Sequence, residues 1–171
     1  MGLNPLSDHA AVRSQCTLMW DDQPLFNVSI GRMLHLLSGY YPTWDQALVE
    51  QLLERFELSP KALPGSLSRG QGTRLRLLIA LAPCPKLLLL DEPASGLDLK
   101  GRQALLESVI EVAGSGLRSV VISSHQLADV ERICDRLLVL NQGHVVQEGP
   151  TDTLVESDRT LEEAMVAWGA A

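Results

Sequence analysis

The sequence predicts an α/β fold in which a parallel sheet core carries an inserted helical subdomain. The unbroken apolar run from Leu87 to Leu90 is typical of a strand that is covered on both faces of a parallel sheet. A second apolar run, Ser119 to Ser124, follows a helical segment, so strands and helices alternate. Residues 30–82 show helical spacing and no strand pattern, which indicates the inserted helical subdomain.

Three helices are expected within that subdomain. The first covers about 30–38, where apolar residues recur three and four positions apart. The second begins at a capping box formed by Thr43 and Gln46 and runs to about Phe56. The third begins at another capping box, formed by Ser68 and Gln71, and runs to about residue 82, where two prolines end it.

The remaining elements complete the alternation of strands and helices. The turn Asn141-Gln142-Gly143 separates two short apolar runs, which predicts a β-hairpin. The short run from Cys16 to Trp20 precedes a polar loop and receives no assignment. In chain order the expected elements are a strand at 87–90, a helix at 101–113, a strand at 119–124, a helix at 126–134, a hairpin at 137–140 and 144–147, and one helix at 151–168.

Composition excludes several classes of protein. The chain has 171 residues, of which 46% are hydrophobic, which is enough for the core of one domain. Its net charge of −7, with only 14 Lys and Arg, argues against nucleic-acid binding, which needs a basic surface. The first residues show no signal peptide, and the apolar stretches fall short of the roughly 20 residues that a membrane span needs.

Asp91 and Glu92 follow the predicted strand at its carboxyl end, where open α/β sheets bind ligands. Two adjacent carboxylates there require a cation or hydrogen bonds for compensation. In a site for a magnesium nucleotide, Asp91 would hold the metal and Glu92 would act as general base toward water. The alternative is a strand that ends in an acidic turn.

Three further candidates follow the same logic. Ser68, Gly70 and Gln71 combine a hydroxyl, a helix N-terminus and a flexible amide, which suit a phosphate group. Their alternative is an ordinary capped helix start. Asp98 closes the motif Ser95-Gly96-Leu97-Asp98, whose alternative is a capped turn, a common structure. His125 follows a strand, and its alternative is an ordinary surface histidine.

The order and spacing of these motifs resemble the nucleotide-binding domain of ABC transporters, which has a P-loop NTPase (RecA-like) core. The family signature is Leu-Ser-Gly-Gly-Gln, and Arg69 replaces its first glycine here. The resemblance implies two cofactors, ATP and Mg2+. It also implies the following roles: catalytic for Glu92 and His125; nucleotide binding for Ser68, Gly70, Gln71 and Asp98; metal binding for Asp91 and Asp21.

The metal-binding position before the helical subdomain has two candidates. Asp21 aligns with the Q-loop of the family because Pro24-Leu25-Phe26 then resembles the segment that follows it, and Gln23 is the alternative. The segment Tyr41 to Asp45 resembles a motif of ABC-2-type, multidrug exporter-like members.

The phosphate loop of the family, Walker A, has no counterpart in the sequence. The three lysines follow Pro60, Pro85 and Leu99, so no Gly-Lys pair exists. We expect an ABC ATPase domain over 1–171 that lacks its N-terminal part, with the helical signature subdomain at 30–82, the α/β core at 83–150 and a C-terminal helix at 151–171. The strand of the missing loop is expected beside the strand that ends at Asp91, so that its absence exposes an edge and leaves the chain marginally stable.

The resemblance implies an ATP-hydrolysing subunit that drives export through a separate transmembrane permease subunit. It would form a homo- or heterodimer with a second ABC ATPase subunit, in the cytoplasm on the inner face of the membrane. Because the Walker A loop is absent, we expect that this chain alone cannot hydrolyse ATP. Two alternatives remain, a non-catalytic subunit whose signature completes a partner's ATP site and an inactive remnant.

Overall fold

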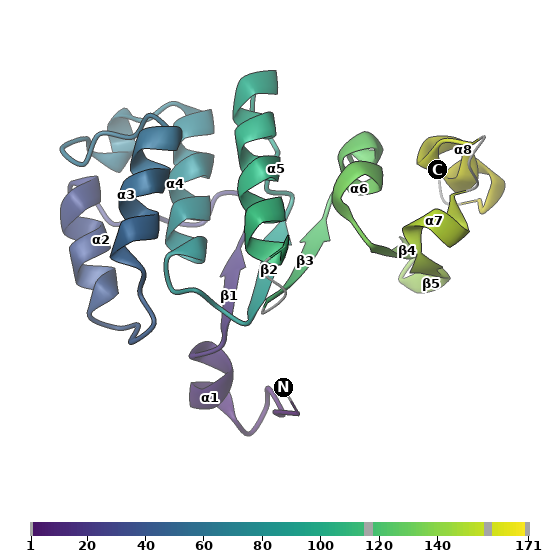
Figure 1. The fold of residues 1–171 in the computed structure, drawn as a ribbon, viewed down its shortest axis with the longest axis horizontal. Helices are drawn as coiled ribbons and strands as arrows, with labels where there is room; N and C mark the ends of the chain where they lie inside the picture. Colours follow the sequence, from purple (N-terminus) through teal and green to yellow (C-terminus); the bar gives the residue numbers. More distant parts are fainter. Residues whose placement is uncertain (1, 115–117, 156–158, 170–171) are drawn as a thin grey trace. The chain divides into compact units, whose positions relative to one another are not determined.

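The computed structural model describes residues 2–114, 118–155 and 159–169, which fall into two compact units, 1–123 and 124–171. The first unit contains a parallel sheet of three strands, shown in Figure 1, in the order β1-β2-β3. These strands are β1 (Cys16–Met19), β2 (Leu87–Asp91) and β3 (Ser119–Ser123). The predicted parallel sheet core is therefore confirmed.

Helices cover one face of this sheet. The helix α4 (Arg69–Leu81) packs on β1, α5 (Leu99–Gly114) packs on β3, and the two helices contact each other. Beneath them Leu88 is fully buried and Leu90 is nearly so. The buried hydroxyl of Thr17 donates to the carbonyl oxygen of Ala80 at 2.8 Å, which ties β1 to α4.

The opposite face of the sheet differs from the prediction. Leu18, Leu89 and Val121 form one row across the three strands. Leu18 is 47% exposed, Val121 is 57% exposed, and Leu89 is half-buried. The prediction that both faces of β2 are buried is therefore wrong, because α4 and α5 cover only the side of Leu88 and Leu90.

The expected open edge beside the Asp91 strand is also wrong. β2 pairs with β1 on one side and with β3 on the other, so both of its edges are hydrogen-bonded. Among the described strands of this unit, the open edges belong to β1 and β3. The expectation of marginal stability that rested on this edge stays untested.

The region between β1 and β2 is helical and strandless, as predicted. It contains α2 (Ile30–Ser38), α3 (Gln46–Arg55), the short 3-10 helix η1 (Pro64–Ser66) and α4. Their shared core consists of side chains at most 1% exposed, among them Ile30, Met33, Val49, Leu52, Phe56, Leu75 and Leu78. The predicted subdomain boundaries, 30–82 and 83–150, stay a prediction.

One predicted helix start is wrong. The N-cap of α3 is Asp45, whose carboxylate accepts from the amide of Leu48 at 2.9 Å. Thr43 instead donates its hydroxyl to the carbonyl oxygen of Pro83 at 2.6 Å, so it ties the start of α3 to the end of α4. The sequence contains the capping-box pattern, but the carboxylate of Asp45, which lies nearer to the helix, forms the N-cap in place of Thr43.

Two elements near the N-terminus were not predicted. The short helix α1 (His9–Arg13) precedes β1, and β1 itself comes from the unassigned run that starts at Cys16. The four residues of β1 are too few to show a pattern in the sequence, and their pairing with β2 defines them as a strand.

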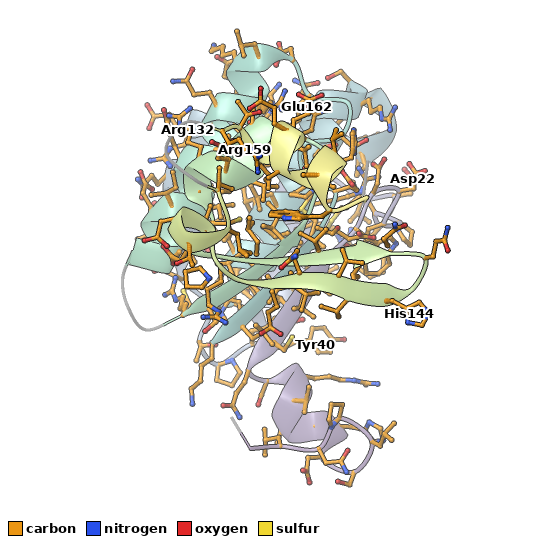
Figure 2. All side chains as sticks on the ribbon, turned by 90° about the vertical axis from the view of Figure 1, so that its right-hand side faces the viewer. Asp22, Tyr40, Arg132, His144, Arg159 and Glu162 are labelled. Carbon is orange, nitrogen blue, oxygen red and sulfur yellow. The ribbon has the colours of Figure 1, made fainter. Side chains whose placement is uncertain are left out.

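The second unit contains α6 (Leu127–Ile133), β4 (Arg136–Asn141), β5 (His144–Pro150), α7 (Thr151–Leu154) and α8 (Leu161–Ala167). β4 and β5 form the predicted antiparallel hairpin. Its turn uses positive φ at Gln142 (49°) and Gly143 (79°), and Figure 2 shows His144 at this end of the hairpin. Leu137, Val155 and Leu161 form the small core of the unit.

The C-terminal segment differs from the single helix expected at 151–168. α7 ends at Leu154, and α8 begins after Thr160, which has extended backbone and forms a capping box with Glu163. A new helix therefore starts at Thr160. Within the three described ranges, no helix is both long enough and apolar enough to cross a membrane.

The two faces of β2 predict a contrast between neighbouring leucines. We expect Leu88→Ala to lower the free energy of unfolding by about 2–5 kcal/mol, because it leaves a cavity under α4 and α5. The matched control is Leu89→Ala on the half-buried face, which should cost less than half as much. Urea unfolding followed by circular dichroism measures both, and equal losses would contradict the one-sided burial.

Candidate functional site

Asp91 lies at the carboxyl end of the central strand, opposite Ser123 at the end of β3. The hydroxyl of Ser123 donates to Oδ1 of Asp91 at 2.5 Å. The amide of Glu92 donates to the same hydroxyl oxygen at 3.1 Å. Ser123 therefore orients both predicted carboxylate residues, although the sequence analysis did not select it. Its position at the end of the adjacent strand was the available signal.

The backbone turns sharply at Glu92. Its φ is +46°, in the left-handed region that side-chain-bearing residues rarely adopt. Its carbonyl oxygen accepts from the amide of Ser95 at 3.0 Å, which closes a turn directly after the strand. Such backbone costs of order 1–3 kcal/mol and concentrates at functional sites. The turn takes Glu92 out of the line of β2.

The capping box at the start of α4 is confirmed. The hydroxyl oxygen of Ser68 accepts from the amide of Gln71 at 3.2 Å, and Oε1 of Gln71 accepts from the amide of Ser68 at 3.0 Å. The cap leaves the hydroxyl proton of Ser68 and the amides of Arg69 and Gly70 unused. These donors stand at the N-terminus of a 13-residue helix, where an anion is stabilised.

Gly70 is not required by the packing of the chain itself. A Cβ added there would meet its nearest neighbour, the side chain of Leu97, at 3.5 Å, which is an ordinary contact. The described chain therefore does not itself exclude a side chain at this position.

Asp98 acts as a helix cap in this structure. Its Oδ1 accepts from the amide of Gly101 at 2.8 Å, at the start of α5. The structural alternative considered for this motif, a capped turn, is thus present. The residue itself is exposed.

Asp21 follows β1 and forms an ion pair across the chain. Nη2 of Arg69 donates to Oδ2 of Asp21 at 2.9 Å, and the amide of Asp22 donates to Oδ1 at 3.1 Å. Desolvation by partial burial raises the pKa of Asp21, but these hydrogen bonds and the charge on Arg69 outweigh it and hold the pKa below its usual value. Asp21 is therefore held as a charged carboxylate.

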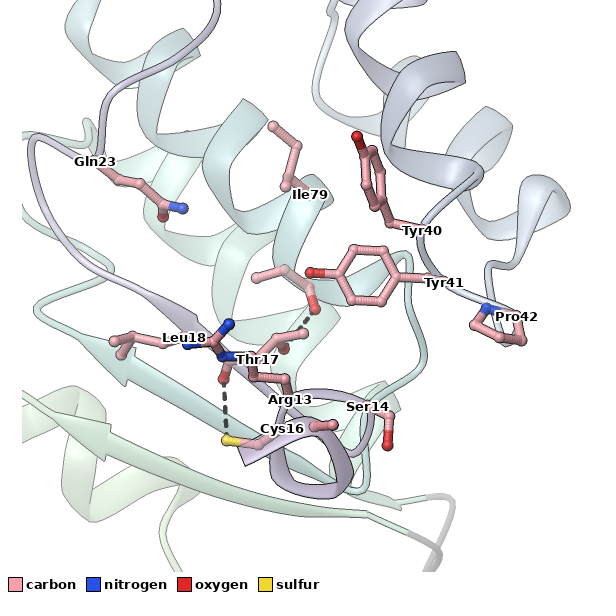
Figure 3. A pocket seen from close by; sticks show the side chains of 12 residues that line it. Arg13, Ser14, Cys16, Thr17, Leu18, Gln23, Tyr40, Tyr41, Pro42 and Ile79 are labelled. Carbon is pink, nitrogen blue, oxygen red and sulfur yellow. Dashed lines mark hydrogen bonds between the residues drawn. The ribbon is translucent and has the colours of Figure 1, made fainter. Parts of the chain in front are cut away.

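The alternative residue, Gln23, occupies a different environment. Its backbone carbonyl accepts from Nε of Arg76 at 2.8 Å. Its Oε1 is buried and has no hydrogen-bond partner among the described residues. Figure 3 shows Gln23 at a cavity of about 420 Å³ that runs along β1 past Tyr41 and Arg13. Gln23 is the only predicted site residue that lines this cavity.

The residues fit a magnesium ion unequally. Among the described residues, no group of three or more His, Cys, Asp or Glu side chains could hold a metal alone. Mg2+ often needs only one or two carboxylates, with water and phosphate oxygens completing its shell. Asp91 fits this requirement because it is exposed and Ser123 engages only one of its oxygens. Asp21 fits less well, because the charge of Arg69 at 2.9 Å opposes a cation there, although each of its oxygens keeps a free lone pair.

His125 belongs to the second unit and comes two residues after β3. It is exposed, and its Nε2 lies 3.2 Å from Nε2 of Gln126. The first unit holds all the other predicted site residues. There the structure joins the segments of Asp21, Ser68 and Asp98 through Arg69, and it joins Asp91 and Glu92 through Ser123.

Comparison with known proteins agrees with these features. The family model described as ABC transporter matches residues 4–95, more than half of the chain. The chain is 40% identical over 114 residues to a Nod factor export ATP-binding protein I of Burkholderia lata, covering 66% of this chain and 37% of that protein. It is 36% identical over 135 residues to a phosphate import ATP-binding protein of Aeropyrum pernix, covering 75% of this chain and 53% of that protein. The chain thus spans about half or less of their length.

Solved structures show the same fold. One, described as an ATP binding subunit of an ABC transporter, has a TM-score of 0.86 and 26% identity and covers 98% of this chain and 74% of its own. Another, described as a dimeric post-hydrolysis state of an ATP-binding cassette bound to ADP and Pi, has a TM-score of 0.73 and 21% identity and covers 88% and 68%. These matches confirm the P-loop NTPase fold class.

The cap at α4 makes a measurable contribution to stability. We expect Ser68→Ala to lower the free energy of unfolding by about 0.5–2 kcal/mol, because the amide of Gln71 loses its acceptor. Ser66→Ala is the matched control, since that hydroxyl donates only to the carbonyl of Leu63 in η1. Chemical denaturation measures both, and equal effects would mean that the cap contributes nothing of its own.

Proposed function

The chain belongs to the ABC transporter family, and from this premise we propose that it acts as an ATP-binding subunit that hydrolyses ATP. One observation carries the proposal. Asp91 and Glu92 leave the carboxyl end of the central strand in the same unit in which Ser68 caps α4. One region thus offers a metal-binding carboxylate and a general base, and the other offers donors for a phosphate.

In the chain's own site, Asp91 would hold Mg2+, which neutralises charge on the phosphates when it is bound. Ser123 keeps the carboxylate of Asp91 in place through its 2.5 Å hydrogen bond. Glu92 would accept a proton from the water that attacks the γ-phosphate. His125 would donate a hydrogen bond to a γ-phosphate oxygen.

The signature segment would serve the ATP of a second ABC ATPase subunit, identical or different. Ser68 retains a hydroxyl proton for a phosphate oxygen, and the amide of Gly70 is left unused by the cap. Because glycine has no side chain, the backbone at Gly70 suits the close approach of a phosphate. Gln71 would hold Ser68 in place, and Asp98 would face the same interface. One similar structure is described as dimeric.

We further propose that the subunit works with a separate transmembrane permease subunit. It would then lie in the cytoplasm, peripheral to the inner face of the membrane. Export is the proposed direction, supported by the name of the Burkholderia lata relative and by the exporter-like segment from Tyr41 to Asp45. The Aeropyrum pernix relative is named for import, so the names of the relatives do not agree on the direction of transport.

A second candidate is a non-catalytic subunit of the same assembly. It is favoured by the signature segment at the start of α4, where the cap leaves the hydroxyl proton of Ser68 and the amide of Gly70 unused. In this case Ser68 would complete the ATP site of the second subunit while Glu92 takes no part. An inactive remnant is the outcome in which neither residue affects turnover.

Glu92→Gln tests the catalytic proposal. In the complex isolated from its host through a tag on this chain, we expect the variant to retain ATP and to lower phosphate release by about 10²- to 10⁴-fold, because the general base is lost. Steady-state phosphate release and retained nucleotide are measured together. Glu107→Gln, an exposed carboxamide variant on α5, is the control and should leave turnover unchanged. Normal turnover by Glu92→Gln would remove Glu92 from this role.

Ser68→Arg, compared with Glu92→Gln, separates the two candidates. The larger cation would fill the space at the start of α4, so we expect phosphate release by the same complex to fall at least tenfold in either case. Gln103→Arg, which adds the same cation at an exposed position of α5, is the control and should leave turnover unchanged. Loss with Ser68→Arg but not with Glu92→Gln would favour the non-catalytic subunit. Full turnover with both variants would reject both candidates.

A further inference from the structure

Arg69 contacts two segments that lie far away in the sequence. Its Nη2 donates to Oδ2 of Asp21 at 2.9 Å, across 48 positions, and to the hydroxyl of Ser95 at 3.4 Å, across 26 positions. Arg69 is the first residue of α4, directly after the capping serine. One guanidinium therefore joins three segments that the sequence analysis selected independently for function.

Gly96 fits this arrangement. Its φ is +70°, and a Cβ added there would lie 2.7 Å from Nε and 2.9 Å from Cδ of Arg69. Such distances do not occur for real Cβ atoms, so the side chain of Arg69 lies directly against the backbone of Gly96. The motif Ser95 to Asp98 therefore provides a hydroxyl acceptor and a bare backbone surface for this arginine.

We propose that Arg69 is a positioning residue that clamps the segments of Asp21 and Ser95 to the start of α4. A planar guanidinium can donate to both acceptors at once, which a glycine at this position could not do. The ion pair is exposed, with 63% of the Arg69 side chain and 32% of the Asp21 side chain accessible. Such pairs add little to global stability, so the effect of the clamp is to order these segments locally.

The clamp gives Asp21 a role that competes with metal binding. Arg69 and the amide of Asp22 each engage one carboxylate oxygen, so a cation at Asp21 would have to share this carboxylate with the positive charge of Arg69, which opposes it. In the proposed function, which this consequence rests on, Asp21 borders the chain's own site, whereas Ser68 serves the second subunit. Arg69 then links the two sites within one chain.

Hydrogen–deuterium exchange on the purified full chain tests the clamp independently of any activity. The reporters are the amides of Ser95 and Leu97, which bond to Glu92 and Ala94, and the amide of Gln23, which bonds to Trp20. We expect Arg69→Met, which keeps the length of the side chain but not its donors, to speed exchange in both segments by about two- to fivefold. Asp21→Asn should speed exchange of the same amides, and the double variant should add nothing further.

The controls separate the clamp from a general loss of structure. Lys100→Ala breaks a comparable exposed ion pair, with Glu57 at 2.8 Å, and should leave both reporter segments unchanged. Peptides that cover β2 should exchange normally in every variant. Arg69→Lys keeps a charged nitrogen with three donors and should restore part of the protection, which a merely space-filling role would not predict.

Unchanged exchange at Ser95 and Leu97 in Arg69→Met would overturn the proposal, as would additive effects of the two single variants. In the isolated complex, Arg69→Met should also lower phosphate release, with partial recovery in Arg69→Lys. If the clamp is seen by exchange while Ser68→Arg and Glu92→Gln have no effect on turnover, the proposed function fails and the clamp remains.

Discussion

The hydrogen bonding of β2 on both of its edges is the constraint on which the first unit depends. Among the described strands, β1 and β3 each pair only with β2, and the helices α4 and α5 pack over its buried leucines. The end of this strand carries Asp91, so the proposed metal site lies at the strand that is paired on both edges. Ser123 reaches Asp91 because β3 pairs with β2 in register to its last residue. Packing of Leu88 and Leu90 thus determines where the carboxylates lie.

Local patterns predicted the helices well and their caps less well. The Ser68 cap involves residues three positions apart, and no nearer acceptor competes with it. At α3 the same pattern failed, because Asp45 lies closer to the amides and carries a charged acceptor. The single C-terminal helix failed for a related reason, since Thr160 caps a new helix inside the predicted range. A cap is therefore predictable only where one candidate stands alone.

Long-range features escaped the sequence analysis for a physical reason. The strand β1 exists through its pairing with β2, about 70 positions later, and its four residues carry no periodic signal. The sheet face at Leu89 was expected to be buried because an unbroken apolar run is typical of a strand covered on both faces, but the run itself does not show which neighbours cover it. Arg69 seemed a minor departure from the family signature, since its partners lie 48 and 26 positions away. Each of these features depends on partner residues that lie far away in the sequence, so no local pattern could predict it.

The packing of the chain requires a glycine at one of two positions near the start of α4, but not at the other. Gly96 is needed by the chain itself, because its φ is positive and Arg69 lies against its backbone. Gly70 is needed by nothing within the described chain, since an added Cβ would make only ordinary contacts. A helix start would be more stable with alanine at that position, because glycine costs roughly 0.5–1 kcal/mol in a helix. In the proposed function, Gly70 would instead serve the close approach of a phosphate from outside the chain, and Arg69, beside it, would position the same segment.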